Sequence, residues 1–161
     1  MKYTITYPTE IGTLRLLSDE ESLLALWFDD GKAPFDWKEA KQEVNYVLKC
    51  TIQWLDVYFS GQNPDFLPSL YLQGTAFQKQ VWQALLEIPY GQTWTYGDIS
   101  RKIFGSTKGS HAIGQAVGKN PISLIVPCHR VIGKKGLTGY AGGVYRKKWL
   151  LEKEKIDSVL Q

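Results

Sequence analysis

The sequence is poor in the residues that mark several common classes of protein. Its 161 residues include only two cysteines, Cys50 and Cys128, and two histidines, His111 and His129. Two cysteines provide no disulfide framework, and these four residues lack the spacing of a zinc site, so we expect no bound metal. No apolar run approaches the roughly 20 residues of a membrane helix, and residues 1–6 alternate polar and apolar, unlike a signal peptide. We therefore expect a cytoplasmic protein with no membrane partner.

Charge is divided unevenly along the chain. Residues 1–70 hold 6 Lys and Arg against 11 Asp and Glu, a net charge of −5, whereas residues 71–161 hold 13 against 5, a net charge of +8. A basic half indicates a polyanionic partner such as nucleic acid. A solvated basic surface would give the same count, so charge alone leaves both interpretations open.

The sequence of the first half of the chain predicts three strands followed by a helix. Residues 2–7, 13–17 and Leu23–Phe28 have the composition of strands, and Gly12 and the acidic residues 19–21 supply turns, so we expect an antiparallel meander. A helix is expected to start at Asp36 and Glu39, to continue through apolar residues from Val44 to Phe59, and to stop at Gly61. Residues 61–74, with two prolines and two glycines, are predicted to be a linker.

The second half is predicted to be mostly helical. One helix begins at a Thr75–Gln78 capping pair, a short helix begins at Thr95 and Asp98, another is capped by Ser110, and a basic helix covers residues 145–155. The glycine-containing turn at 105–109 makes the middle pair typical of a helix-turn-helix. We therefore expect an α+β protein with a small N-terminal α/β domain (1–70) and a helical C-terminal domain (71–161) that carries the helix-turn-helix.

The helix that begins at Ser110 is unusually rich in small residues. We expect Ala112, Ile113, Ala116 and Val117 on its inner face, with Gly114 and Gly118 adding little bulk. Such a surface suits close packing between helices, and it also lets a backbone approach DNA. Taken alone, the pattern favours helix packing over DNA binding.

Cys128 lies in the string Pro127-Cys128-His129-Arg130-Val131, after an apolar run at 122–126 that we expect to be a strand. A thiol becomes a nucleophile as thiolate, which a neighbouring cation or imidazole favours. Because Cys128 and His129 are adjacent, their side chains need not meet, and a water could bridge them. A free cysteine is also a common buried residue, so chemistry and packing both remain open.

Three aromatic residues add to the interpretation as a nucleic-acid protein. Trp94 and Tyr96 precede the short helix, and Tyr140 lies in the glycine-rich segment after Cys128. Unstacked bases are commonly held against aromatic rings. Half-buried aromatic residues in loops would give the same pattern.

A series of motifs between Gly74 and Glu154 resembles, in order, the O6-alkylguanine-DNA alkyltransferases, also called methylated-DNA–protein-cysteine methyltransferases. The resemblance implies an N-terminal domain similar to ribonuclease H and irreversible, single-turnover transfer of an alkyl group to Cys128. The substrate would be O6-alkylguanine, and also O4-alkylthymine, in double-stranded DNA, and the protein would act as a monomer without a cofactor. The matching segments are Gly74-Thr75-Ala76-Phe77-Gln78, Val81-Trp82, Ile88-Pro89-Tyr90-Gly91, Thr95-Tyr96, Asn120-Pro121, Ile125-Val126-Pro127-Cys128-His129-Arg130-Val131, Gly139-Tyr140-Ala141-Gly142-Gly143 and residues 147–154.

The same resemblance implies roles for the residues around the thiol. His129 would be the general base, acting through water, and Glu154 would orient it. Asn120 would brace the turn before the active-site strand, and Tyr96 would help rotate the nucleotide and protonate the departing guanine. The guanine pocket would be lined by Tyr140 and by the backbone of Cys128, Val131 and Ala141, and Trp94 is a further candidate for substrate binding.

The helix-turn-helix would enter the minor groove, with DNA contacts from Ser110, Ala112, Gln115 and Arg130. One position departs from the family pattern, because His111 stands where many members carry an arginine that fills the space left by the flipped base. We hypothesise that His111 fills the same gap with a weaker hold, since its side chain is shorter and mostly neutral at pH 7.

Three other functions compete with this one. A damage sensor of the same fold would lack the cysteine, and a regulator would use the helix-turn-helix alone, leaving Cys128 and Glu154 unused. A cysteine hydrolase would assemble its cysteine and histidine from distant segments. The residues at 128–130 favour the alkyltransferase over each of them.

Overall fold

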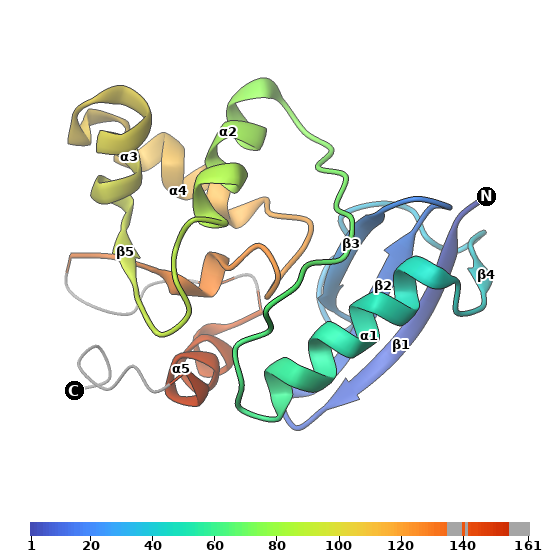
Figure 1. The fold of residues 1–161 in the computed structure, drawn as a ribbon. Helices are drawn as coiled ribbons and strands as arrows, with labels where there is room; N and C mark the ends of the chain where they lie inside the picture. Colours follow the sequence, from blue (N-terminus) through green and yellow to red (C-terminus); the bar gives the residue numbers. More distant parts are fainter. Residues whose placement is uncertain (135–139, 141, 155–161) are drawn as a thin grey trace. The chain divides into compact units, whose positions relative to one another are not determined.

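The computed structural model describes residues 1–134, 140 and 142–154. The chain divides into two units, Met1–Gln73 and Gly74–Gln161. The first holds a sheet and one helix, and the second holds the remaining helices, which is the expected α+β arrangement (Figure 1). Within the described ranges, no helix combines the length and apolar character needed to cross a membrane.

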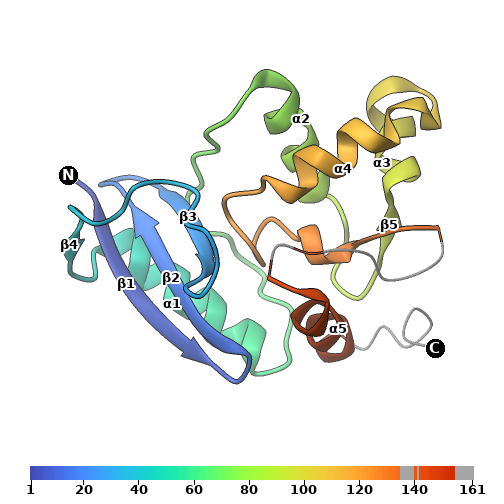
Figure 2. The same ribbon diagram turned by 180° about the vertical axis from the view of Figure 1, so that it is seen from behind.

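The N-terminal sheet confirms the three predicted strands. Its strands are β1 (Tyr3–Thr9), β2 (Gly12–Ser18) and β3 (Leu23–Phe28), paired as an antiparallel meander in the order β3-β2-β1-β4. Helix α1 (Tyr46–Phe59) lies across one face. All six residues of β3 are buried, because the segment before β4 packs on the opposite face (Figure 2). That segment contributes Ala33, Phe35, Trp37 and Ala40.

The predicted helix start at Asp36 is wrong, because α1 begins ten residues later. Its N-cap is Asn45, whose Oδ1 accepts a hydrogen bond from Leu48 N at 2.9 Å, whereas Asp36 only closes a local turn with Lys38 N. The intervening residues are used elsewhere, since Trp37 packs on the sheet and β4 (Lys41–Gln42) pairs in parallel with β1. The predicted stop is confirmed: the helix ends at Phe59, and Gly61 has φ 92°.

The segment predicted as a linker is anchored to the N-terminal sheet at one point. Leu23 N donates to Ser69 O at 2.7 Å, and Tyr71 N donates to Leu23 O at 3.0 Å. This single parallel bridge between Leu23 and Leu70 extends the edge of the sheet at β3. Residues 69–71 therefore belong structurally to the first unit.

The C-terminal unit contains the predicted helices. They are α2 (Ala76–Leu85), α3 (Tyr96–Phe104), α4 (Ser110–Gly118) and α5 (Val144–Lys153), and β5 (Trp94–Thr95) pairs in parallel with β6 (Val131–Ile132). Both predicted capping boxes form, at Thr75–Gln78 and at Thr95–Asp98. Between α3 and α4 the chain turns through Gly105, with φ 77°, and the short helix η1 (Thr107–Gly109), which completes the helix-turn-helix.

Two details of α4 differ from the prediction. Ser110 does not cap the helix: the N-cap is Gly109, and Ser110 Oγ donates to Thr107 O at 2.7 Å, inside the preceding turn. Ala112 is exposed, whereas Ile113, Ala116 and Val117 are buried. The buried side is fixed by α2, because Trp82 Nε1 donates to Ala116 O at 2.8 Å.

Asn45 ties the start of α1 to the sheet and provides a test of the corrected boundary. Its Nδ2 donates to Asp19 O at 2.9 Å, and Ser18 Oγ donates to its Oδ1 at 3.2 Å. We expect Asn45→Ala to lower the free energy of unfolding by about 1–2 kcal/mol, measured by urea denaturation. The control Asp36→Ala removes an exposed carboxylate and should change stability by less than about 0.5 kcal/mol. A larger loss at Asp36 than at Asn45 would contradict the assignment.

Candidate active site

The predicted strand at 122–126 is wrong, because these residues form a buried turn. Asn120 holds the turn closed: its Oδ1 accepts from Ile122 N at 3.0 Å, and its Nδ2 donates to Val126 O at 2.8 Å. Leu124, at the middle, adopts a φ of 70°, which is unusual for a residue other than glycine. The apolar side chains remain buried, so hydrophobicity alone matches a strand equally well. The bracing role implied for Asn120 fits this geometry.

Cys128 opens the short helix η2 (Cys128–Arg130) directly after this turn. Its side chain is 5% exposed and lines a pocket of about 320 Å³. Tyr96, Asn120 and Tyr140 also line this pocket, and α4 contributes Gly114, Val117 and Gly118. The structure therefore brings four of the predicted site residues together at one cavity, beside the second helix of the helix-turn-helix.

His129 is completely buried and bonded to the carboxylate of Glu154. The distance from Nε2 to Oε2 is 2.6 Å. Burial lowers the pKa of His129, although Glu154 partly opposes the shift, so the ring is neutral at pH 7. A carboxylate can only accept, so Nε2 carries the proton and Nδ1 holds the lone pair that a general base needs.

Glu154 also binds Arg130. Arg130 Nε donates to Glu154 Oε1 at 2.8 Å, and Arg130 Nη1 donates to Ile88 O at 2.8 Å. Burial alone would raise the pKa of Glu154, but the hydrogen bonds and charges of His129 and Arg130 lower it to about 2. Arg130 is 8% exposed, so its predicted role as a DNA contact is wrong. Its guanidinium instead joins η2 to the segment after α2 and to the end of α5.

The thiol and the tyrosine of the pocket are held in their neutral forms. Burial raises the pKa of Cys128, while Asn120 and the charge of Lys147 act in the opposite direction. Burial and the neighbouring Cys128 raise the pKa of Tyr140 well above its ordinary value. At neutral pH Cys128 is therefore mainly a thiol, and forming the thiolate requires a base.

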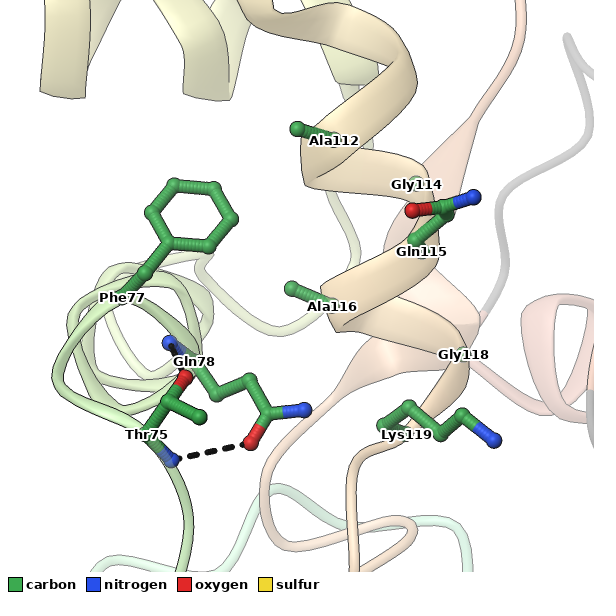
Figure 3. Close-up of a pocket in the computed structure, with 9 residues that line it drawn as sticks. All are labelled: Thr75, Phe77, Gln78, Ala112, Gly114, Gln115, Ala116, Gly118 and Lys119. Carbon is green, nitrogen blue, oxygen red and sulfur yellow. Dashed lines mark hydrogen bonds between the residues drawn. The ribbon is translucent and has the colours of Figure 1, made fainter.

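The exposed side of α4 carries the residues predicted to meet DNA. His111 Nε2 lies 3.2 Å from Gln115 Nε2, so these two exposed side chains form a pair one turn apart. Ala112 and Gln115 line a groove of about 620 Å³ between α4 and the start of α2 (Figure 3). Gly114 and Gly118 line this groove and also the pocket of Cys128. A narrow strip of backbone therefore separates the two depressions.

Three residues predicted to line the guanine pocket lie elsewhere or cannot be placed. Trp94 and Val131 face each other as partners in the β5–β6 ladder, and neither occurs among the described residues lining the pocket. Trp94 instead lies under Lys102, whose Nζ is 5.8 Å from the ring centroid. Ala141 lies outside the described residues.

Lys147 is the residue near the site that the sequence prediction missed. Its side chain is 1% exposed, and its charge acts on Cys128. The signal was available, because Lys147 precedes Leu150 and Leu151 by three and four residues and so shares their inward face. Lysine is rarely buried, so a lysine on an apolar helix face is an exception that the sequence pattern can reveal.

The fold and the site together define a class: a two-domain protein in which a helix-turn-helix lies against a buried cysteine–histidine–glutamate site. Two family models match the chain. The ribonuclease-like domain of 6-O-methylguanine DNA methyltransferase matches residues 1–69, and the DNA-binding domain of the same family matches residues 76–156.

Individual relatives agree with the family models. A methylated-DNA–protein-cysteine methyltransferase of Methanosarcina acetivorans is 44% identical over 153 residues, covering 94% of this chain and 97% of the relative. One from Haemophilus influenzae is 42% identical over 160 residues, covering 98% and 88%. The crystal structure of the Mycobacterium tuberculosis O6-methylguanine methyltransferase superposes with a TM-score of 0.87 at 41% identity, covering 96% and 93%.

The chain belongs to the 6-O-methylguanine DNA methyltransferase family. It is a DNA repair enzyme with the activity of a methylated-DNA–protein-cysteine methyltransferase. It binds DNA, and a similar structure, M. tuberculosis OGT in complex with DNA, has a TM-score of 0.86 at 40% identity over 95% of this chain and 92% of that one.

The interactions of Glu154 make the free energy of unfolding depend on pH in the acid range. The folded pKa of about 2 lies below the ordinary 4.5, so this stabilisation is present above about pH 4.5 and is lost as the pH falls toward 2. We expect Glu154→Gln to lower the free energy of unfolding at pH 7 by about 3 kcal/mol, because Arg130 stays buried without its counter-charge. Urea denaturation between pH 2 and pH 7 should show a shallower acid dependence in this variant. The control is exposed Glu152→Gln, which should keep the wild-type slope; an equal slope in both variants would refute the assignment.

Proposed function

We propose that Cys128 is the acceptor and takes the alkyl group from O6-alkylguanine in double-stranded DNA. The observation that carries this proposal is the position of the thiol: it lines an open pocket, and the next residue in the chain is His129, which is buried and bonded to Glu154. The pocket volume lies in the range of about 300–1,000 Å³ usual for small-molecule sites. A flipped base would enter this pocket and present its alkyl carbon to sulfur.

The proposed reaction is a displacement at the alkyl carbon. His129 Nδ1 receives the thiol proton through a bridging water, and the resulting thiolate attacks the carbon. The S–C bond forms as the C–O6 bond breaks, and the electron pair stays with the guanine. Tyr96, which lines the same pocket, supplies the proton that the departing guanine takes up. The product is a thioether, so each molecule acts once. The protein acts as a monomer and without a cofactor.

The proposed DNA surface is the exposed side of α4. Gly114 and Gly118 separate the pocket from the groove shown in Figure 3, and neither adds a side chain that would keep a duplex away. His111 and Gln115 project from the same helix as a hydrogen-bonded pair. We propose that His111 fills the space left by the flipped base.

Intact mass tests the acceptor. We expect incubation with an O6-methylguanine duplex to add about 14 Da, a methyl replacing a hydrogen, once per molecule. Peptide mapping should place it on Cys128, and Cys128→Ser should gain nothing while still binding the lesion. Methylation of Cys50 instead, or a lesion bound without transfer, would refute the proposal. A duplex with O4-methylthymine tests the second predicted substrate in the same assay.

His111→Arg tests the gap-filling role. Arginine adds reach and a fixed positive charge, so we expect affinity for the lesion duplex to rise by up to about tenfold and transfer at low DNA concentration to accelerate. Affinity is measured in the Cys128→Ser background, and the rate with Cys128 present. Lys108→Arg, an exposed change in the adjacent turn, is the control. Identical affinity and rate in His111→Arg and wild type would exclude this role.

A further inference from the structure

Lys147 is a buried cation on a helix face that is otherwise apolar, and its charge acts on the thiol of Cys128. Its side chain is among the largest fully buried ones of the described residues. It shares the inward face of α5 with Leu150 and Leu151, and Glu154 follows one turn later. This face packs against η2, where Cys128 begins.

While Cys128 is a thiol, the buried ammonium of Lys147 has no anionic partner among the described residues. Glu154 is ionised and uses both carboxylate oxygens for His129 and Arg130. Among the described residues, no carboxylate lies within ion-pair distance of Lys147. Lys147 and Cys128 are surrounded by further titratable and charged groups. These are His129 and Arg130 on η2, Arg146 and Glu154 on or beside α5, and Tyr140.

We propose that Lys147 is a positioning residue whose buried ammonium is the counter-charge of the Cys128 thiolate. When the thiol proton passes to His129, the net charge of the buried groups is unchanged, but the thiolate is then stabilised by Lys147 and the new imidazolium by Glu154. Lys147 keeps its own proton, and His129 takes the one from sulfur. The inference deepens the proposed function, because it rests on Cys128 acting as the alkyl acceptor.

The pKa shifts of Lys147 and Cys128 agree with this arrangement. Burial lowers the pKa of Lys147 to about 8, and Cys128 is the one group that raises it. Conversely, the charge of Lys147 lowers the pKa of Cys128 against the effect of burial. Because the ammonium and the thiolate stabilise each other, removing either one weakens the charged form of the other.

The test is the pH dependence of thiol reactivity in Lys147→Met, which keeps the length of the side chain and removes the charge. Iodoacetamide attacks as the S–C bond forms and iodide leaves, and the rate at the Cys128 peptide reports the thiolate fraction. We expect the midpoint of the pH–rate curve to move up by about one unit, with the rate at pH 7 about tenfold lower. Lys147→Arg should restore most of the rate, and exposed Lys148→Met on the same helix should match wild type.

Methyl transfer from the lesion duplex is measured with the same proteins. It should slow in Lys147→Met at pH 7 and recover toward wild type at high pH. A slower reaction with an unchanged midpoint would mean that Lys147 only supports packing and would overturn the inference. If the iodoacetamide midpoint moves but no variant transfers methyl to Cys128, the counter-charge stands and the proposed acceptor role fails.

A measurement that does not depend on a Lys147 variant completes the test. The pKa of Lys147 is followed by NMR of its side chain in wild type and in Cys128→Ala. We expect a lower pKa in Cys128→Ala, because the group that stabilises the ammonium is gone. An unchanged pKa would overturn the inference.

Discussion

The carboxylate of Glu154 is the group on which the rest of the site depends. One oxygen fixes the ring of His129, and the other receives Arg130 Nε and the backbone N–H of Gly91. Three segments distant in sequence therefore meet at one residue: the segment after α2, the helix η2 and the end of α5. Since the side chains of His129, Arg130 and Glu154 are all buried, loss of the carboxylate would leave a guanidinium without compensation and a histidine free to turn.

This arrangement separates the ionised groups from the neutral ones. Glu154 is ionised at neutral pH, whereas Cys128, His129 and Tyr140 rest in neutral forms, because burial disfavours charge on each of them. The site is therefore prepared for one proton transfer and carries no persistent thiolate that would react with other electrophiles. In the proposed reaction the charge appears only when His129 removes the proton.

Local signals predicted the parts of the fold that local interactions determine. The capping boxes at Thr75 and Thr95 form as expected, since each involves residues three apart. The expected helix start at Asp36 failed because Trp37 packs on the sheet, a contact between residues far apart in sequence that no capping pattern contains. The local preference for a helix start at Asp36 was outweighed by packing of the partly buried indole of Trp37 on the sheet.

In the site, too, the sequence predicted some features correctly and others wrongly. The motif around Cys128 led to His129, Glu154 and Asn120. The strand predicted at 122–126 is not formed, because Asn120 folds these apolar residues into a buried turn. The adjacent cation Arg130 was predicted to contact DNA, but it lies in a three-residue helix with no periodic pattern from which its direction could be predicted. Only the fold shows that Arg130 faces Glu154.

Helix α4 shows why small residues at this position matter to both depressions. Gly114 lies beside Tyr96, since a Cβ added there would be 3.7 Å from its ring, an ordinary contact distance, whereas a Cβ on Gly118 would meet nothing within 4 Å. Packing inside the protein therefore does not require either glycine. Gly114, in the helix interior, also lowers the intrinsic stability of the helix by about 1 kcal/mol relative to alanine. A cost without a packing reason is best explained by an external surface that must approach the backbone closely, which is what a duplex delivering a base to the pocket of Cys128 would do.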